Sequence, residues 1–145
     1  MREIKFRAWD KDAGCMLYSN SGDDEAIWRI EWKEGIVVLT MQTVDSFPGG
    51  LYHEQENKYL PADVEIMQFT GLLDKNGKEI YEGDVVNQEK WVQVGRYVRS
   101  IGIVKYKGCG FVVECIGDWM GSNATLNSNA EVIGNQYENP DLLDK

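Results

Sequence analysis

Residues 67–86, MQFTGLLDKNGKEIYEGDVV, are the stretch that decides the fold we expect for this chain. Asn76 and Gly77 lie between two apolar pairs, and an Asn-Gly pair tolerates the positive φ angles of a tight hairpin turn. Residues 82–84 form a second turn, after which two valines begin a strand that suits a curved sheet. The stretch predicts β structure and holds no grouping of nucleophile, base or ligand residues.

The same turn has an alternative interpretation as a calcium-binding loop. Such a loop places acidic or amide ligands at its first, third and fifth positions and glycine at its sixth. Counted from Asp74, the fifth position is Lys78 and the glycine arrives at the fourth. The spacing therefore favours a hairpin over a calcium site.

Length and composition allow one domain or two small lobes with a real core. The chain has 145 residues, of which 43% are hydrophobic, and its 15 glycines and 3 prolines accompany short runs of β-branched and aromatic residues. This composition favours a β-rich protein. The formal net charge of −9 opposes non-specific attraction to nucleic-acid phosphates, which depends on lysine and arginine.

The N-terminal residues MREIK are charged instead of apolar, so they do not resemble a secretory signal. No run of the sequence approaches the roughly 20 apolar residues that cross a bilayer. We therefore expect a soluble cytoplasmic protein that makes no membrane contact.

Three cysteines and one histidine are the candidate soft metal ligands. Cys15, Cys109 and Cys115 are an odd number without a framework spacing, and a cytoplasmic location favours free thiols. His53 could complete a set of four ligands, but Cys109 and Cys115 do not form a tight knuckle. We expect free thiols, no metal and no cofactor.

The first 62 residues read as a β-rich N-terminal lobe. Residues 3–9 alternate in polarity and predict a strand that returns over 15–18. Residues 23–34 fit a helix or a strand, and the alternation of two tryptophans with an isoleucine favours the strand, with 36–41 as its hairpin partner. Residues 46–61 break the pattern and suggest the boundary of the lobe.

Residues 63–145 read as a second part built of short strands. Strands are expected at 63–69, 85–86, 102–106, 111–116 and 131–135, with a strand interrupted by Gly95 at 91–98 and a polar loop at 117–129. Asn139 is expected to cap a short C-terminal helix that begins with Pro140. Short strands with tight connections, in this rhythm, suggest a small SH3-like barrel.

Three blocks of sequence resemble the YopX family, small proteins encoded by bacteriophages and prophages of Gram-positive bacteria. The first block is residues 2–10, REIKFRAWD; the second runs from QFTGL at 68–72 to DVV at 84–86. The third is EVIGN at 131–135 with YENP at 137–140. The resemblance implies an SH3-like barrel of phage origin that is expressed inside a bacterial host, and it implies no activity, substrate or catalytic residue.

An enzymatic function is not expected. Catalysis by a cysteine–histidine pair would need the segment around His53 to approach one of the three cysteines, and nothing in the sequence indicates this. Glu79, Glu82 and Asp84 form a carboxylate cluster. We interpret that cluster as a solvated turn in which Asp84 accepts hydrogen bonds from backbone amides.

A single-stranded nucleic-acid-binding module is the alternative function. The segment 88–107 combines cations with aromatic residues and contains Glu89 as its acid, a pattern used by small barrels that bind single strands. The competing interpretation places the aromatic residues in the core and the cations on an outer strand face. The candidate contacts are Lys90, Trp91, Arg96, Tyr97, Arg99, Lys105 and Lys107.

A protein-interaction or self-assembly module is the function we favour from the sequence. Trp28, Trp32 and Trp119 lie in segments that could leave apolar surface for a partner. An unpaired strand edge in the N-terminal hairpin could also join a second copy. We therefore expect a protein partner or a homo-oligomer.

Overall fold

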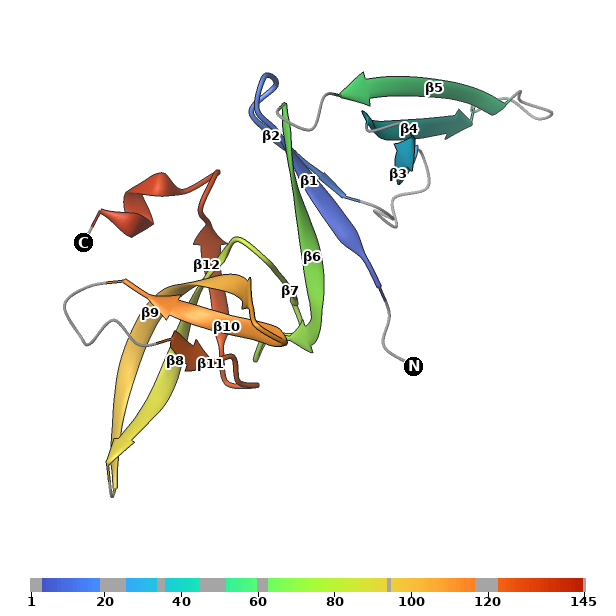
Figure 1. The fold of residues 1–145 in the computed structure, drawn as a ribbon. Coiled ribbons are helices and arrows are strands. Elements are labelled where there is room, and N and C mark those ends of the chain that lie inside the picture. The colour runs from blue at the N-terminus through green and yellow to red at the C-terminus, as the bar shows by residue number, and fades with distance from the viewer. Residues whose placement is uncertain are drawn as a thin grey trace. The chain divides into compact units, whose positions relative to one another are not determined.

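The computed structural model describes residues 4–18, 26–33, 36–44, 52–59, 63–93, 95–116 and 123–144. For 26–33, 36–44, 52–59 and 90–93 it describes the backbone alone. The chain divides into two compact units, one formed by Lys5–Met67 and the other by Met1–Ile4 with Gln68–Lys145. Strands dominate both units, which confirms the mainly β fold class (Figure 1).

The N-terminal unit begins with a hairpin closed by an aspartate. Strand β1 (Phe6–Asp10) pairs with β2 (Cys15–Tyr18) in antiparallel register. Oδ1 of Asp10 accepts hydrogen bonds of 2.9 Å from the backbone N–H groups of Asp12 and Ala13. This local bonding fixes the turn, as the Asp-Lys-Asp-Ala-Gly composition predicts.

A three-stranded sheet follows, in the order β3 (Ala26–Lys33), β4 (Ile36–Val44), β5 (Tyr52–Tyr59). The strand interpretation of residues 23–34 is confirmed for 26–33 by β3, and the rest of that range lies outside the described residues. The interpretation of 46–61 as a break in the pattern was wrong for β5, which pairs with β4 along its whole length. A strand at the end of a sheet pairs through its backbone, so a polar sequence does not prevent it.

Strand β6 (Val64–Leu73) begins in the N-terminal unit and ends in the C-terminal unit. In the C-terminal unit its end pairs with β7 (Glu79–Tyr81), where Phe69 lies opposite Tyr81 with ring centroids 5.4 Å apart. Thr70 Oγ1 donates a hydrogen bond of 2.8 Å to the Ile80 carbonyl. The predicted hairpin around Asn-Gly is thereby confirmed.

The turn of this hairpin differs from the expected one. A hydrogen bond of 3.0 Å from the Gly77 N–H to the Asp74 carbonyl makes Lys75 and Asn76 the central residues. Gly77 follows them with a φ of +85°. A turn whose last residue is this left-handed glycine forms a three-residue hairpin loop, longer than the two-residue Asn-Gly turn.

The carboxylate of Asp74 joins this turn to the last strand. Its Oδ1 accepts hydrogen bonds from the N–H groups of Asn76 (2.7 Å) and Lys78 (2.9 Å), and its Oδ2 accepts one of 3.1 Å from Val132. Burial raises the pKa of this carboxyl. The hydrogen bonds from the backbone N–H groups of Lys78, Val132 and Asn76 together lower the pKa by more, so the net pKa lies below the ordinary value for aspartate.

The C-terminal unit contains a five-stranded antiparallel sheet in the order β11-β10-β9-β8-β12. Its core combines the sheet with Ile80 of β7, and the buried members are Ile80, Val86, Val104, Val113, Ala124, Leu126 and Ala130. Curled sheets of this kind are consistent with a small barrel (Figure 1). The strands are β8 (Asp84–Gln93), β9 (Arg96–Lys107), β10 (Gly110–Cys115), β11 (Asn123–Thr125) and β12 (Glu131–Asn135).

Two expectations for this unit need correction. Residues 91–98 are not one interrupted strand, because the chain turns at Gly95, where φ is +76°, and β8 pairs back onto β9. Residues 117–129 are not entirely loop, because β11 pairs with β10 through Ala124, which enters the core. A strand of three residues is too short to show the alternation of polar and apolar residues by which a strand is predicted.

The described C-terminus ends in a four-residue 3₁₀ helix, Pro140–Leu143, with the proline in its first turn. The predicted cap is wrong: the Asn139 side chain makes no capping bond, and its Oδ1 accepts a hydrogen bond of 3.2 Å from the Asn135 N–H.

Within the described part of the chain, no helix is long and apolar enough to cross a membrane.

Replacement of Asp74 by asparagine should destabilise the C-terminal unit by about 1–3 kcal/mol. One carboxylate oxygen would become an amide NH₂ group, which cannot accept the hydrogen bond that a backbone N–H group now donates to it. Because the pKa of Asp74 is lower in the folded state, the ionised carboxylate contributes its full stabilisation at pH values above the ordinary pKa of 3.8. This stabilisation is lost as the pH falls through the folded-state pKa. Denaturant unfolding at several pH values measures both effects. The exposed Asp12→Asn is the control, and equal losses in the two variants would contradict the assignment.

Replacement of Gly102 by alanine should lower the free energy of unfolding by about 1–3 kcal/mol, because its Cβ would lie 2.5 Å from both the Glu114 carbonyl oxygen and Val113 Cγ1. Gly110→Ala on the neighbouring strand is a matched control, since its Cβ would meet nothing within 4 Å. Denaturation midpoints compare the two. A Gly102→Ala protein as stable as Gly110→Ala would show that the sheet relaxes around the new methyl group.

Candidate interaction surface on the β8–β9 hairpin

The far ends of β8 and β9 leave the five-stranded sheet as a two-stranded ribbon. The pairing of β12 with β8 ends at Asn87, and the pairing of β10 with β9 begins at Gly102. Beyond these points the strands pair with each other down to the turn at Gly95. We call residues 88–93 with 96–101 the β8–β9 ribbon, and Figure 1 shows it extending past the other strands of its sheet.

The base of the ribbon is fixed by a buried glutamine. Gln88 is 2% exposed; its Nε2 donates to the Thr125 carbonyl at 3.2 Å, and its Oε1 accepts from the Asn127 N–H at 3.3 Å. The Asn127 side chain donates in turn to the Glu89 carbonyl at 3.0 Å. A ribbon held at its base in this way projects in a defined direction, although an isolated hairpin is only marginally stable.

The ribbon exposes a large aromatic side chain between two cations. Tyr97 is 66% exposed, and both Arg96 and Arg99 are exposed. Strand alternation places Tyr97 and Arg99 on one face. Among the side chains that the structure describes, none forms an ion pair with either arginine, although the Cα of Arg99 is directly opposite that of Glu89.

The predicted basic patch is divided into two parts. Lys105 and Lys107 lie on β9 within the main sheet, and both form ion pairs with Glu114 of β10, at 2.5 and 3.0 Å. Lys107 also contacts Asn123 Oδ1 at 3.3 Å. Hydrogen bonds from Lys105 and Lys107 lower the pKa of Glu114. Glu89 is therefore not the only acid near these cations, and two of the five cations of the patch share the single carboxylate of Glu114.

The remaining predicted contacts fall on or beyond the limits of the description. Lys90 and Trp91 belong to β8, opposite Val98 and Tyr97, and only their backbone is described. The same holds for Trp28 and Trp32 in β3, which pair with Met41 and Val37. Trp119 and the side chain of His53 lie outside the described residues.

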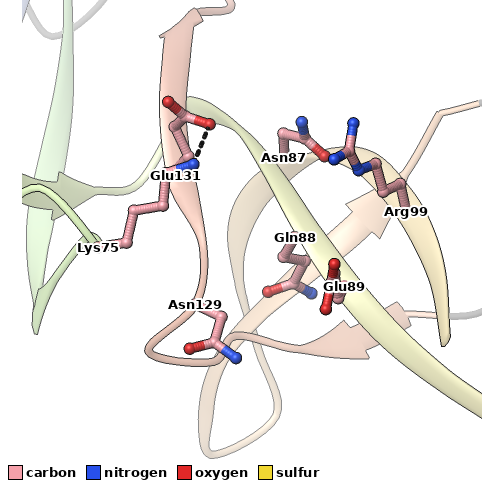
Figure 2. A pocket seen from close by; sticks show the side chains of 7 residues that line it. All are labelled: Lys75, Asn87, Gln88, Glu89, Arg99, Asn129 and Glu131. Carbon is pink, nitrogen blue, oxygen red and sulfur yellow. Dashed lines mark ion pairs between the residues drawn. The ribbon is translucent and has the colours of Figure 1, made fainter.

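A polar pocket of about 310 Å³ lies at the base of the ribbon (Figure 2). Lys75 and Glu131 form an ion pair of 2.7 Å at its wall. Its cations and anions are equal in number, so it presents no strong field of one sign. The lining residues are Lys75, Asn87, Gln88, Glu89, Arg99, Asn129 and Glu131.

The carboxylates next to β7 accept hydrogen bonds from backbone N–H groups and from a tyrosine hydroxyl. Asp84 is 1% exposed, so the expected solvated turn is wrong, but its Oδ2 accepts the expected amide bond, 2.8 Å from the Tyr81 N–H. Glu79 accepts a bond of 2.7 Å from the Tyr81 hydroxyl, and Glu82 accepts one of 3.3 Å from the Tyr106 N–H. Among the described residues no three His, Cys, Asp or Glu side chains converge on a metal position.

Sequence reasoning missed Glu114, the ribbon and the role of Gln88, and the first two could have been found from strand pairing. The turn at residues 107–110 sets the register of β9 against β10, which brings Glu114 opposite Ile103 and within reach of Lys105. The ribbon follows from the length of β9, whose 12 residues exceed the 6 of β10. Gln88 gives no such signal, because a buried glutamine reads as a surface residue.

Comparison with known proteins identifies the family of this chain. The family model of the YopX protein matches residues 5–144. The chain belongs to the YopX family. A crystal structure of protein EF1440 from Enterococcus faecalis is similar to this YopX protein, with a TM-score of 0.61 and 27% sequence identity over 99% of each chain. No curated protein matches the chain.

Proposed function

We propose that this YopX protein is a non-enzymatic protein-interaction or self-assembly module, and that the β8–β9 ribbon is its contact surface. The observation that carries the proposal is an aromatic side chain, Tyr97, held 66% exposed on a ribbon whose base is anchored. Exposed aromatic residues beside arginine are characteristic of the central contacts of protein interfaces. Trp28 and Trp32, and Trp119, are proposed as further partner contacts.

The proposed setting follows from the family. A YopX protein is expected to be encoded by a phage or prophage and to act in the cytoplasm of the bacterial host. The curled sheet of the C-terminal unit is consistent with our assignment of a small SH3-like barrel, a fold that hosts many functions, so the proposal rests on the ribbon and not on the fold. Glu79, Asp84 and Asp74 each accept a structural hydrogen bond, which supports a role without catalysis.

Binding of single-stranded nucleic acid is the second candidate function. The exposed Tyr97 with Arg96 and Arg99 favours it, since stacking on an aromatic ring and cationic contacts to phosphate are what it requires. The pairing of Lys105 and Lys107 with Glu114 argues against it. The net charge of −9 also works against phosphate binding, so we rank it below protein interaction.

A photoreactive amino acid at Tyr97 should give a discrete covalent adduct with a protein when the full chain is expressed in a Gram-positive host. The same photoreactive group at Tyr18, which is 41% exposed and lies in the N-terminal unit, is the matched control. Gel analysis and mass spectrometry identify the adducts. A ribbon position that gives no more adduct than Tyr18 would argue against the ribbon as contact surface.

If the ribbon binds single strands, labelled oligonucleotides should bind with an affinity that falls steeply with salt, and Arg96→Glu with Arg99→Glu should abolish the binding. Glu114→Gln should strengthen binding, because it releases Lys105 and Lys107 from their ion pairs. Fluorescence anisotropy measures each affinity. Absence of binding at low salt, in both the parent and Glu114→Gln, removes this candidate.

A further inference from the structure

We propose that two copies of the chain join through the edge of β9 that faces away from β8 in the ribbon, in an antiparallel register centred on Val98. This inference rests on the proposed function, since it names a second copy as the partner of that contact surface. It follows from the direction of backbone groups, from pairing parity and from the positions of charges along residues 96–101.

The ribbon has backbone donors and acceptors on its β10 side. The Ile116 N–H donates to the Ile101 carbonyl at 2.9 Å, so the polar backbone groups of Ile101 are directed toward β10. Because these directions alternate along a strand, the N–H and C=O groups of Arg99 and Tyr97 are directed to the same side. Among the described residues no strand pairs with Arg99 or Tyr97 there, since the β10 pairing ends at Gly102.

Parity limits how two such edges can pair. An antiparallel partner must place residues with outward groups opposite residues with outward groups. For two identical β9 edges, the two-fold axis must then pass through a single residue. A centre on any residue satisfies this condition, whereas centres between residues place an outward group against an inward one. A centre at Ser100 would pair Arg99 with Ile101, whose carbonyl already accepts the Ile116 N–H, and a centre at Arg96 would place Tyr97 opposite the turn, so Tyr97, Val98 and Arg99 remain.

Charge and hydrogen-bond number select Val98 among the three centres. A centre at Arg99 would put two arginines directly opposite each other, and like charges in that position destabilise a sheet. A centre at Tyr97 would oppose Arg99 to Gly95, at the turn. A centre at Val98 makes Tyr97 and Arg99 of one copy face Arg99 and Tyr97 of the other, so both pairs exchange backbone hydrogen bonds.

This register also gives Arg99 a partner that it lacks in the single chain. Within each copy its Cα already lies opposite Glu89, and across the new edge it lies opposite the aromatic Tyr97 of the second copy. A guanidinium next to an aromatic ring is attracted by its π face. The row across the four strands is then Glu89 and Arg99 of one copy with Tyr97 and Trp91 of the other, and the two-fold axis generates a second such row in the opposite direction. One contact thus brings together the exposed aromatic ring and the Arg99 guanidinium, while Arg96 faces Ser100.

A cysteine at residue 98 tests the register directly. In the proposed dimer the two Val98 residues form a non-hydrogen-bonded pair with Cα atoms about 4.5 Å apart, which suits a disulfide. With the three native cysteines replaced, Val98→Cys should therefore give a covalent dimer under mild oxidation. Ser100→Cys, on the same face, is the control, because each Ser100 would face Arg96 of the other copy. Equal cross-linking of both variants, or none of Val98→Cys, overturns the register.

A proline at residue 99 tests the edge. The Arg99 N–H is directed away from β8, so proline there removes an edge donor and leaves the β8–β9 pairing in place. Relative to Arg99→Ala, Arg99→Pro should raise the dimer dissociation constant at least about tenfold in sedimentation experiments at physiological salt. Circular dichroism checks that both variants are folded. Equal dissociation constants would overturn the edge pairing.

The two proposals fail separately. A monomeric parent chain at all concentrations, combined with a photoreactive Tyr97 that couples to a different protein, overturns the dimer and supports the interaction function. A monomer whose Tyr97 couples to nothing overturns both. Self-adducts from Tyr97 that accompany the Val98→Cys disulfide support both.

Discussion

The carboxylate of Asp74 is the constraint on which the C-terminal unit depends. Three backbone donors converge on it, two from its own turn and one from Val132 of β12, a strand 58 residues further along the chain. A neighbouring bond of 3.0 Å from the Lys75 N–H to the Ala130 carbonyl reinforces the same connection. A turn that the sequence alone would place at the surface thus determines where β12 packs against the rest of the C-terminal unit.

Much of the fold could be predicted, because its strong signals are local. Glycine positions with positive φ and short β-branched runs mark the turns and strands of the C-terminal unit, and the alternation of Trp28, Ile30 and Trp32 correctly favoured strand over helix. Strands without an apolar pattern were missed. β5 is polar and pairs through its backbone, and β11 is three residues long, so neither carries a period that a sequence can show.

Composition indicated the proposed contact surface but not its shape. The segment 88–107 was recognised as cationic and aromatic, yet which of its cations have an acidic partner depends on the register that brings Glu114 near Lys105 and Lys107. Tertiary pairing decides which cations remain available, and composition alone counts them all. The same pairing shows why β9 serves two environments, with its second half in the core sheet and its first half outside it.

The ribbon also has an evolutionary consequence. Among residues 88–101 whose side chains the structure describes, none belongs to the buried hydrophobic cluster, and the buried Gln88 lies at the base. The length of the ribbon beyond Gln88 can therefore vary among relatives without disturbing that core. Side chains alternate between faces, however, and the two strands pair one to one from the base of the ribbon to Trp91, with a bulge between Trp91 and Gln93. Length changes among relatives should therefore collect near the tip, where a bulge already absorbs one unmatched residue. A single residue inserted into one strand nearer the base would move the side chains beyond it to the other face of the ribbon.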